Sequence, residues 1–170
     1  IAAGYWQAKL GRDALKLQWD LATVEKVDSE QQLIQYRALA GQPGLVHFDA
    51  DMAPLATAKH QLEAEFVFPY LAHAPMEPLN CTVRITQNKC EIWTGTQFQT
   101  LDQMIAGKIT GLKPEQVEIH TQFLGGGFGR RANPTSDFVA EAVEVAKAAG
   151  APVKTVWSRE DDIRGGYYRS

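Results

Sequence analysis

A run of glycines between a strand pattern and a helix pattern constrains this chain most. Four of the five positions from 125 to 129 are glycine, Phe128 is the exception, and Arg130 and Arg131 follow. Glycine allows positive φ and lets the backbone come close to a ligand. Successive N–H groups in such a loop can bind an anion, and arginines can add charge-assisted donors. The run favours a ligand-binding loop over the plainer alternative, a tight turn with two solvated arginines.

Alternation of apolar and polar residues predicts the strands of the chain. The clearest case is a hairpin of residues 79–86 and 90–94, joined by a polar turn. Weaker strand patterns occupy residues 14–19 and 65–70. The remaining predicted strands are 117–123 and 153–157.

Apolar periodicity and end signals predict the helices. Ser29 opens a capping box before a helix that stops at Gly41, and Thr100 with Gln103 opens another that runs to about residue 109. Further helices are expected at residues 5–10 and 135–149, and a solvated helix start at 159–162. Strands and helices mix without regular βαβ alternation, so we predict an α+β fold of mixed β-sheets with flanking helices.

Composition excludes several classes of protein. The 170 residues carry 17 basic and 20 acidic side chains, a formal net charge of −3, which argues against non-specific nucleic-acid binding. No apolar run approaches the ~20 residues of a membrane span. Cys81 and Cys90 form no C-x-x-C pair and the four histidines are scattered, so we expect no metal site from this chain alone and two buried free thiols. Because the chain starts at Ile1, we expect a piece of a longer protein.

The glycine run matches known nucleotide motifs only in part. Residues 127–132 fit the relaxed pattern G-x-G-x-x-A, but the acidic residue expected ~20 positions later is missing from its place. The Walker pattern fails because no G-K-[ST] is present. A nucleotide-binding module that uses Gly125–Arg131 as a phosphate cradle stays open as the alternative function.

Four segments in register resemble one family. They resemble the large, molybdenum-binding (beta) subunit of the xanthine dehydrogenase/aldehyde oxidase family, in particular the bacterial isoquinoline 1-oxidoreductase-like beta subunits. The opening of the chain is similar to the tail of that branch's preceding hammerhead-like domain. The resemblance implies residues 1–24 as this tail and residues 25–170 as the first part of the molybdopterin-binding domain. The segments that carry the resemblance are 72–80, 91–97, 124–131 and 152–162.

The resemblance implies a molybdenum hydroxylase or aldehyde oxidoreductase. Such a subunit binds molybdopterin, in bacteria generally as the cytosine dinucleotide, and oxidises an N-heterocycle or aldehyde with oxygen from water. Electrons pass to iron–sulfur clusters, here on a small partner subunit. The implied partners are that subunit, the remaining part of the same large subunit and the small-molecule substrate, with no nucleic acid and no transmembrane segment. Cytoplasm and periplasm both stay open, because relatives can carry a twin-arginine leader.

The resemblance assigns site roles residue by residue. Gln97 matches the family glutamine that hydrogen-bonds a molybdenum oxygen, and Phe128 and Gly129 match the loop beside the metal, so Gln97 and Phe128 are the catalytic candidates. Gly126 and Gly127 would permit close approach of the cofactor. The full cofactor-binding set is Gln97, Gly126, Gly127, Phe128, Gly129 and Arg130.

Three further positions bear on these site roles. Arg131 is expected to face solvent or a carboxylate, and Glu77 to cap backbone amides in a turn between two prolines. Ala132 stands where purine-oxidising members carry a substrate-binding glutamate, so purine binding is not expected. The family's general-base glutamate lies downstream of these residues, so the fragment alone should be inactive. A non-catalytic module that docks a partner is the third hypothesis.

Overall fold

The computed structural model describes residues 1–169, which fall into two units. The first unit joins Ile1–Leu15 to the chain from Tyr70 onward, and the second is Lys16–Pro69. Each unit is described by itself. The glycine run and every predicted site residue belong to the first.

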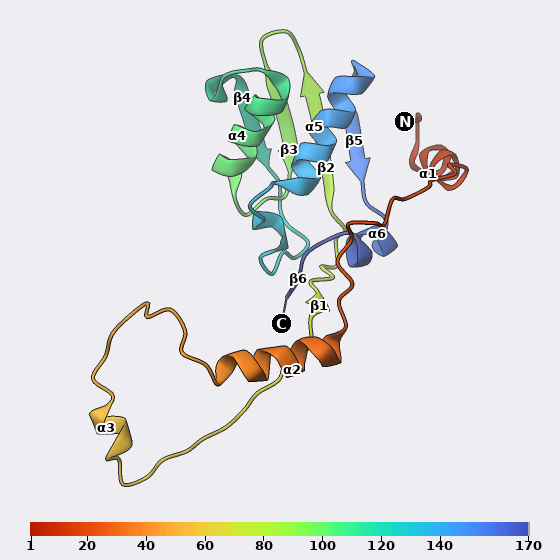
Figure 1. Cartoon of the computed structure of the whole chain (residues 1–170). Coiled ribbons are helices and arrows are strands. Elements are labelled where there is room, and N and C mark those ends of the chain that lie inside the picture. Colours follow the sequence, from red (N-terminus) through yellow and green to blue (C-terminus); the bar gives the residue numbers. More distant parts are fainter. Residues whose placement is uncertain (170) are drawn as a thin grey trace. The chain divides into compact units, whose positions relative to one another are not determined.

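A four-stranded sheet forms the centre of the first unit (Figure 1). Its order is β4-β3-β2-β5, with β2 antiparallel to both β3 and β5. β3 and β4 are parallel because a helix connects them, whereas the hairpin turn makes β2 and β3 antiparallel. The strands are β2 (Asn80–Ile85), β3 (Cys90–Thr94), β4 (Val117–Thr121) and β5 (Val153–Val156).

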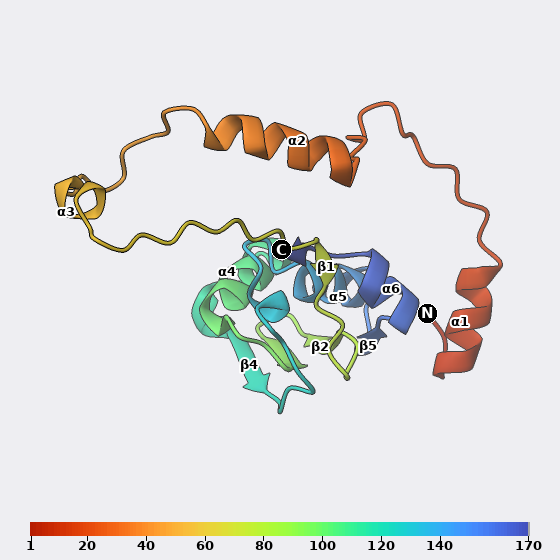
Figure 2. The same cartoon turned by 90° about the horizontal axis from the view of Figure 1, so that it is seen from below.

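Two helices, α4 (Gln99–Thr110) and α5 (Asp137–Ala149), cover the same face of this sheet, as Figures 1 and 2 show. Strand alternation turns Cys81, Val83 and Ile92 toward the helices, and these side chains are at most 1% exposed. The helix predicted at residues 135–149 is confirmed, and one apolar face of it is buried: Phe138, Val139, Ala142, Val143 and Ala146. The core contains Leu79, Cys81, Val83, Cys90, Ile92, Ala106, Val117, Phe138, Val139, Ala142, Val143 and Ala146.

Smaller elements complete the first unit. Strand β1 pairs antiparallel with β6 and brings the segment before β2 beside the end of the described chain. The Ser158 hydroxyl accepts from the backbone N–H of Asp161 and so caps α6. The acidic run there is therefore a helix start, as predicted. These elements are α1 (Tyr5–Asp13), β1 (Leu71–Ala72), η1 (Pro114–Gln116), η2 (Arg130–Ala132), α6 (Arg159–Arg164) and β6 (Tyr168–Arg169).

The second unit contains α2 (Ser29–Ala40) and α3 (Ala53–Ala56), and neither helix has a buried residue. The helix predicted here is confirmed, but its cap lies one residue earlier. The Asp28 carboxylate, not the Ser29 hydroxyl, accepts from the backbone N–H of Gln31. Gly41 ends the helix as predicted.

Three local predictions are wrong. Residues 14–19 and 65–70 form no strand, because no neighbouring strand in the described chain offers them backbone partners. Thr100 does not cap α4, whose N-cap is Phe98. The Gln103 amide instead donates to two backbone oxygens of the η1–β4 connection. Apolar alternation alone therefore predicted strands that tertiary pairing does not supply.

The two cysteines are buried free thiols, as predicted. Burial raises the pKa of Cys81 to about 12 and that of Cys90 to about 11. Their place on β2 and β3 puts both in the core. Within residues 1–169, no helix has the length and apolar character that a membrane crossing requires.

Candidate functional site

The glycine run forms an irregular loop between β4 and η2. Three of its residues have positive φ: Gly126 (102°), Phe128 (54°) and Gly129 (93°). The loop closes where the Arg130 N–H donates to the carbonyl oxygen of Gly127 at 2.9 Å. Positive φ explains Gly126 and Gly129, because L side chains rarely adopt it. At Gly125 and Gly127 a Cβ would instead lie 2.3 Å from Glu77 Cβ and 2.5 Å from Gln97 Oε1. Phe128 tolerates it with a side chain that is 74% exposed.

Three consecutive backbone N–H groups of this loop are free. Within the part of the chain that the structure describes, those of Gly126, Gly127 and Phe128 donate to no acceptor. Successive unpaired N–H groups create a concave, positively polarised surface that suits an oxygen acceptor. The loop therefore keeps backbone donors available, and anion binding by the loop stays a prediction.

Gln97 follows β3 and its side chain reaches this loop. Its Oε1 accepts from the backbone N–H groups of Gly129 (3.2 Å) and Arg131 (3.3 Å). Since two N–H donors fix the oxygen, the amide nitrogen Nε2 must face the other way, and it has no partner among residues 1–169. Gly127 is essential to this arrangement, because a Cβ there would lie 2.5 Å from Gln97 Oε1.

Glu77 holds the start of the loop, in the turn between two prolines. Its backbone N–H donates to Gly125 O (3.0 Å), and its Oε2 accepts from Gly125 N (2.8 Å). Its Oε1 accepts from the Asn80 amide at 2.8 Å. Burial alone would raise the pKa of Glu77, but these hydrogen bonds and the charge of Arg131 lower it. The prediction that Glu77 caps backbone amides is confirmed.

The two arginines after the loop are both buried, which rules out the plainer alternative of a solvated pair. The Arg130 guanidinium pairs with Asp137 at the start of α5 (2.7 Å) and lies over the rings of Trp157 and Tyr167. The Arg131 side chain is 0% exposed and pairs with Glu77 at 2.9 Å. The expected carboxylate partner of Arg131 is thus present, whereas neither guanidinium is presented to solvent.

The structure brings together all six residues predicted to bind cofactor. Four are consecutive in the loop, Arg130 follows them as the first residue of η2, and Gln97 reaches the loop through its hydrogen bonds. Sequence reasoning missed the part played by Gly95, whose carbonyl oxygen accepts from Arg131 Nη1 at 3.1 Å. Nothing in the local sequence indicates this contact, because the two residues are 36 positions apart.

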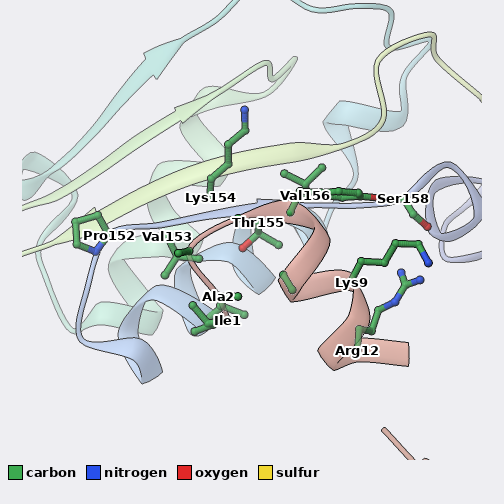
Figure 3. Close-up of a pocket in the computed structure, with 15 residues that line it drawn as sticks. Ile1, Ala2, Lys9, Arg12, Pro152, Val153, Lys154, Thr155, Val156 and Ser158 are labelled. Carbon is green, nitrogen blue, oxygen red and sulfur yellow. The ribbon is translucent and has the colours of Figure 1, made fainter. Parts of the chain in front are cut away.

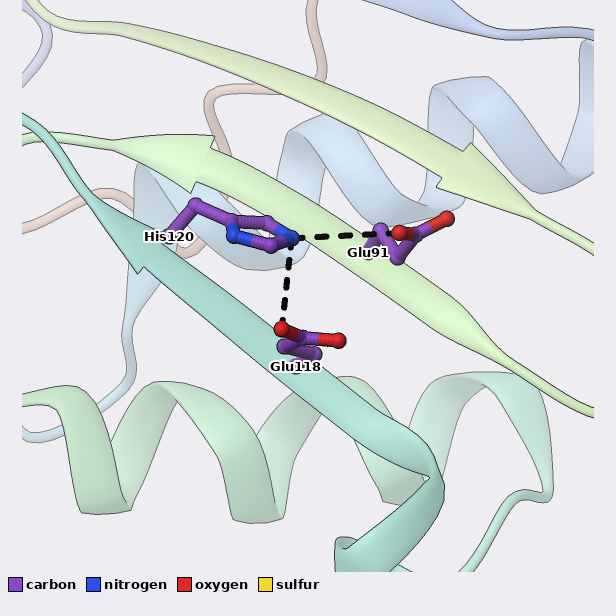
Figure 4. A group of neighbouring side chains, drawn as sticks. All are labelled: Glu91, Glu118 and His120. Carbon is purple, nitrogen blue, oxygen red and sulfur yellow. Dashed lines mark ion pairs between the residues drawn. The ribbon is translucent and has the colours of Figure 1, made fainter.

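The open face of the sheet carries a separate polar group. Glu91, Glu118 and His120 lie together there, with His120 Nε2 3.8 and 3.7 Å from the two carboxylates (Figure 4). Lys89 already pairs with both carboxylates, and Arg84 pairs with Glu91. The positive charge that a metal ion would supply is therefore present in side chains, and we assign the group as an ion-pair cluster.

A hollow of about 460 Å³ lies between α1 and β5 (Figure 3). It shares no residue with the glycine loop, Gln97 or Glu77. Its two cationic side chains on α1, Lys9 and Arg12, both pair with Asp13, and Arg12 also pairs with Asp161. We assign no function to it.

Comparison with known proteins identifies the loop's context. The molybdopterin cofactor-binding domain family matches residues 40–170. The chain belongs to this family. The resemblance to molybdenum-binding subunits of the xanthine dehydrogenase/aldehyde oxidase family is thereby confirmed, as is the α+β fold.

Individual relatives agree with the family assignment. The beta subunit of isoquinoline 1-oxidoreductase from Brevundimonas diminuta is 34% identical over 110 residues, 64% of this chain and 13% of that protein. A membrane-bound aldehyde dehydrogenase [pyrroloquinoline-quinone] from Gluconacetobacter polyoxogenes is 29% identical over 177 aligned residues, 100% of this chain and 22% of that protein. The molybdopterin-binding chain therefore spans less than a quarter of the length of these relatives.

A solved structure matches the fold. The aldehyde oxidoreductase from Desulfovibrio gigas superposes on this molybdopterin-binding chain with a TM-score of 0.57 and 28% identity, over 71% of this chain and 13% of that one. This likeness agrees with the fold described above, a mixed sheet with two helices on one face.

Proposed function

We propose that this chain forms part of a molybdenum hydroxylase or aldehyde oxidoreductase subunit, and that the glycine loop with Gln97 holds its molybdopterin cofactor. The observation that carries the proposal is the donor set at the loop. Three free backbone N–H groups and the unpaired Nε2 of Gln97 belong to one small cluster, built by hydrogen bonds of 3.2 and 3.3 Å.

The residues present fit such a group. Its pterin and metal-bound oxygens are hydrogen-bond acceptors, and the cluster offers neutral donors that do not titrate. Glycine at position 127 lets the Gln97 amide lie directly against the loop backbone, because a Cβ there would collide with Gln97. Exposed Phe128 offers an apolar ring next to the donors. Donors beside an apolar surface are typical of a cofactor site.

The chain's own residues would bind the cofactor and orient it. Gln97 Nε2 would donate to an oxygen of the group, and the loop N–H groups from Gly126 to Phe128 would fix its position. Gly129 and Arg131 hold the Gln97 oxygen, so the amide is oriented before anything binds. Such preorganised donors cost no reorganisation during the reaction. When bound, the group supplies two-electron oxidation of the substrate with oxygen taken from water.

Arg130 enters this proposal as the residue that closes the loop. Its N–H donates to Gly127 O, and its guanidinium is held by Asp137. We further propose an N-heterocycle or aldehyde substrate, the cytosine-dinucleotide form of the cofactor, and electron transfer to a small iron–sulfur subunit; family membership supports these proposals. We also propose residues 25–170 as the first part of the molybdopterin domain, after a hammerhead-like tail at 1–24. We propose that these residues do not turn over substrate without the remainder of the subunit.

The free N–H groups also fit the phosphate of a nucleotide, which keeps a nucleotide-binding module as the second candidate. The buried guanidinium groups of Arg130 and Arg131 weaken it, because both are committed to internal carboxylates. Phosphate sites usually add such cations to the backbone donors.

Metal and pterin analysis of the intact subunit tests the proposal. The subunit is expressed with molybdenum-cofactor assembly proteins and its partner subunit, and oxidation of N-heterocycles and aldehydes is assayed. We expect about one molybdenum and one pterin per subunit. A folded, metal-free subunit that binds NAD or a quinone instead would refute the proposal. A Gln97→Ala subunit should lose turnover by about 10²- to 10³-fold if its amide donates to reacting charge.

A further inference from the structure

On the basis of the function proposed above, we propose that the buried ion pair of Arg131 and Glu77 is a positioning device for the cofactor site. It would fix the glycine loop and the Gln97 amide in one relative geometry. Both residues act through other groups, because neither belongs to the donor set itself.

The Arg131 side chain connects three segments that are distant in sequence. Its Nε donates to Gly126 O in the loop (2.9 Å), and its Nη1 donates to Gly95 O just after β3 (3.1 Å). Its Nη2 donates to the carbonyl oxygen of Glu77 (3.0 Å) and to the Glu77 carboxylate (2.9 Å). One fully buried guanidinium therefore sets the distances among the loop, the end of β3 and the turn at Glu77.

The Arg131 backbone holds the remaining member of the site. Its N–H donates to Gln97 Oε1 at 3.3 Å, and its carbonyl oxygen accepts from Gln97 N–H at 3.1 Å. Arg131 thus hydrogen-bonds Gln97 through its main chain and the loop through its side chain. A displacement of the guanidinium would change the position of Gln97 relative to Gly126.

Glu77, the second member of the ion pair, also contacts the glycine run directly. Its carboxylate bridges Arg131 and the Gly125 N–H, and its backbone N–H returns a bond to Gly125 O. The fit is close, because a Cβ at Gly125 would lie 2.3 Å from Glu77 Cβ. The Glu77 carboxylate consequently holds Gly125, the first glycine of the run, while Arg131 holds Gly126.

The chemistry of this pair favours positioning over simple stabilisation. A buried ion pair often adds no more stability than apolar side chains of similar volume would. A guanidinium, however, spreads five N–H donors over three nitrogens in one rigid plane, whereas the three donors of a lysine ammonium all sit on one nitrogen. A device that joins Gly95, Gly126 and Glu77 needs that geometry.

Conservative variants of the intact subunit test the role, purified with its partner and with cofactor. Arg131→Lys keeps the charge but loses the fork, and Glu77→Gln keeps the shape but loses the charge. Arg84→Lys and Glu91→Gln are matched controls, because they alter an arginine–glutamate pair on the open sheet face. The readouts are the rate of pterin release from the folded subunit, followed by fluorescence, and the Mo(V) EPR spectrum.

We expect Arg131→Lys and Glu77→Gln to release pterin about 10- to 100-fold faster than the controls and to change the EPR spectrum, as supporting contacts around a metal site do. Control-like release rates and an unchanged spectrum in a loaded subunit would overturn the positioning role and leave the proposed function intact. Both site variants unfolding where both controls stay folded would also overturn it, since the pair would then be structural. A wild-type subunit without molybdenum would overturn the proposed function and the positioning role together.

Discussion

Replacement of Gly127 by alanine tests the contact between the loop and Gln97 most sharply. The added Cβ would lie 2.5 Å from Gln97 Oε1 and 2.9 Å from its Cδ, where ordinary contact begins at 3.4 Å. The amide must therefore retreat by about 1 Å. Because the obstacle is the end of a flexible side chain, and Gly127 has no positive φ, the backbone itself can stay in place.

The expected loss of stability follows from the hydrogen bonds that this movement of the Gln97 amide breaks. Gln97 Oε1 would lose its bonds to Gly129 and Arg131, worth about 0.5–1.5 kcal/mol each, while the loss of a glycine returns about 0.4–1 kcal/mol through the unfolded chain. We expect a net loss of stability of about 0–3 kcal/mol, which lowers Tm by several degrees at most. A donor misplaced by about 1 Å can reduce turnover about 10²-fold.

The assay compares molybdenum content, turnover and Tm of the intact Gly127→Ala subunit with wild type. Gly11→Ala is the matched control, because a Cβ at Gly11 would meet nothing within 4 Å. Wild-type turnover together with wild-type metal content in Gly127→Ala would refute the reasoning. So would a loss of activity that only accompanies unfolding.

Three further predictions concern charge, thiols and core. Glu77→Gln should flatten the pH dependence of stability, because the folded pKa of Glu77 lies below its usual 4.5. The Tm of wild type should exceed that of the variant fully at neutral pH, and this difference should vanish as pH falls through the lowered pKa. A difference that grows on acidification would contradict this sign. Cys81 and Cys90, with pKa values of about 12 and about 11, should resist a thiol reagent at pH ~8 until the chain unfolds, and rapid native labelling would disprove their burial. Phe138→Ala should cost about 3–5 kcal/mol in denaturant unfolding, since its side chain is 2% exposed, and a loss below ~1 kcal/mol would mean that α5 does not seal the core.

Local patterns predicted the elements whose partners lie nearby. The hairpin of β2 and β3 and the buried face of α5 follow from alternation and periodicity, which a sheet covered on one side imposes. Residues 14–19 and 65–70 show similar alternation and form no strand, because a strand needs a neighbour that local sequence does not reveal.

The site was predictable to the extent that its residues are consecutive. The glycines mark the loop because positive φ favours Gly126 and Gly129 and close contacts favour Gly125 and Gly127. The family resemblance adds Gln97. The surroundings of Arg131 could not be predicted, since its partners Gly95 and Glu77 lie 36 and 54 positions away. A carboxylate partner was among the alternatives for Arg131, but only the packing of the unit shows that both arginines are buried and that Asp137 pairs with Arg130.

Anomalous diffraction from crystals of the intact, loaded subunit tests the central claim most directly. Data on either side of the molybdenum absorption edge locate the metal without assumptions about the cofactor. We predict one peak beside the loop, with Gln97 Nε2 and the N–H groups of Gly126, Gly127 and Phe128 directed toward the metal's oxygen or pterin atoms. A fully occupied molybdenum peak remote from Gln97 and the loop would contradict the account.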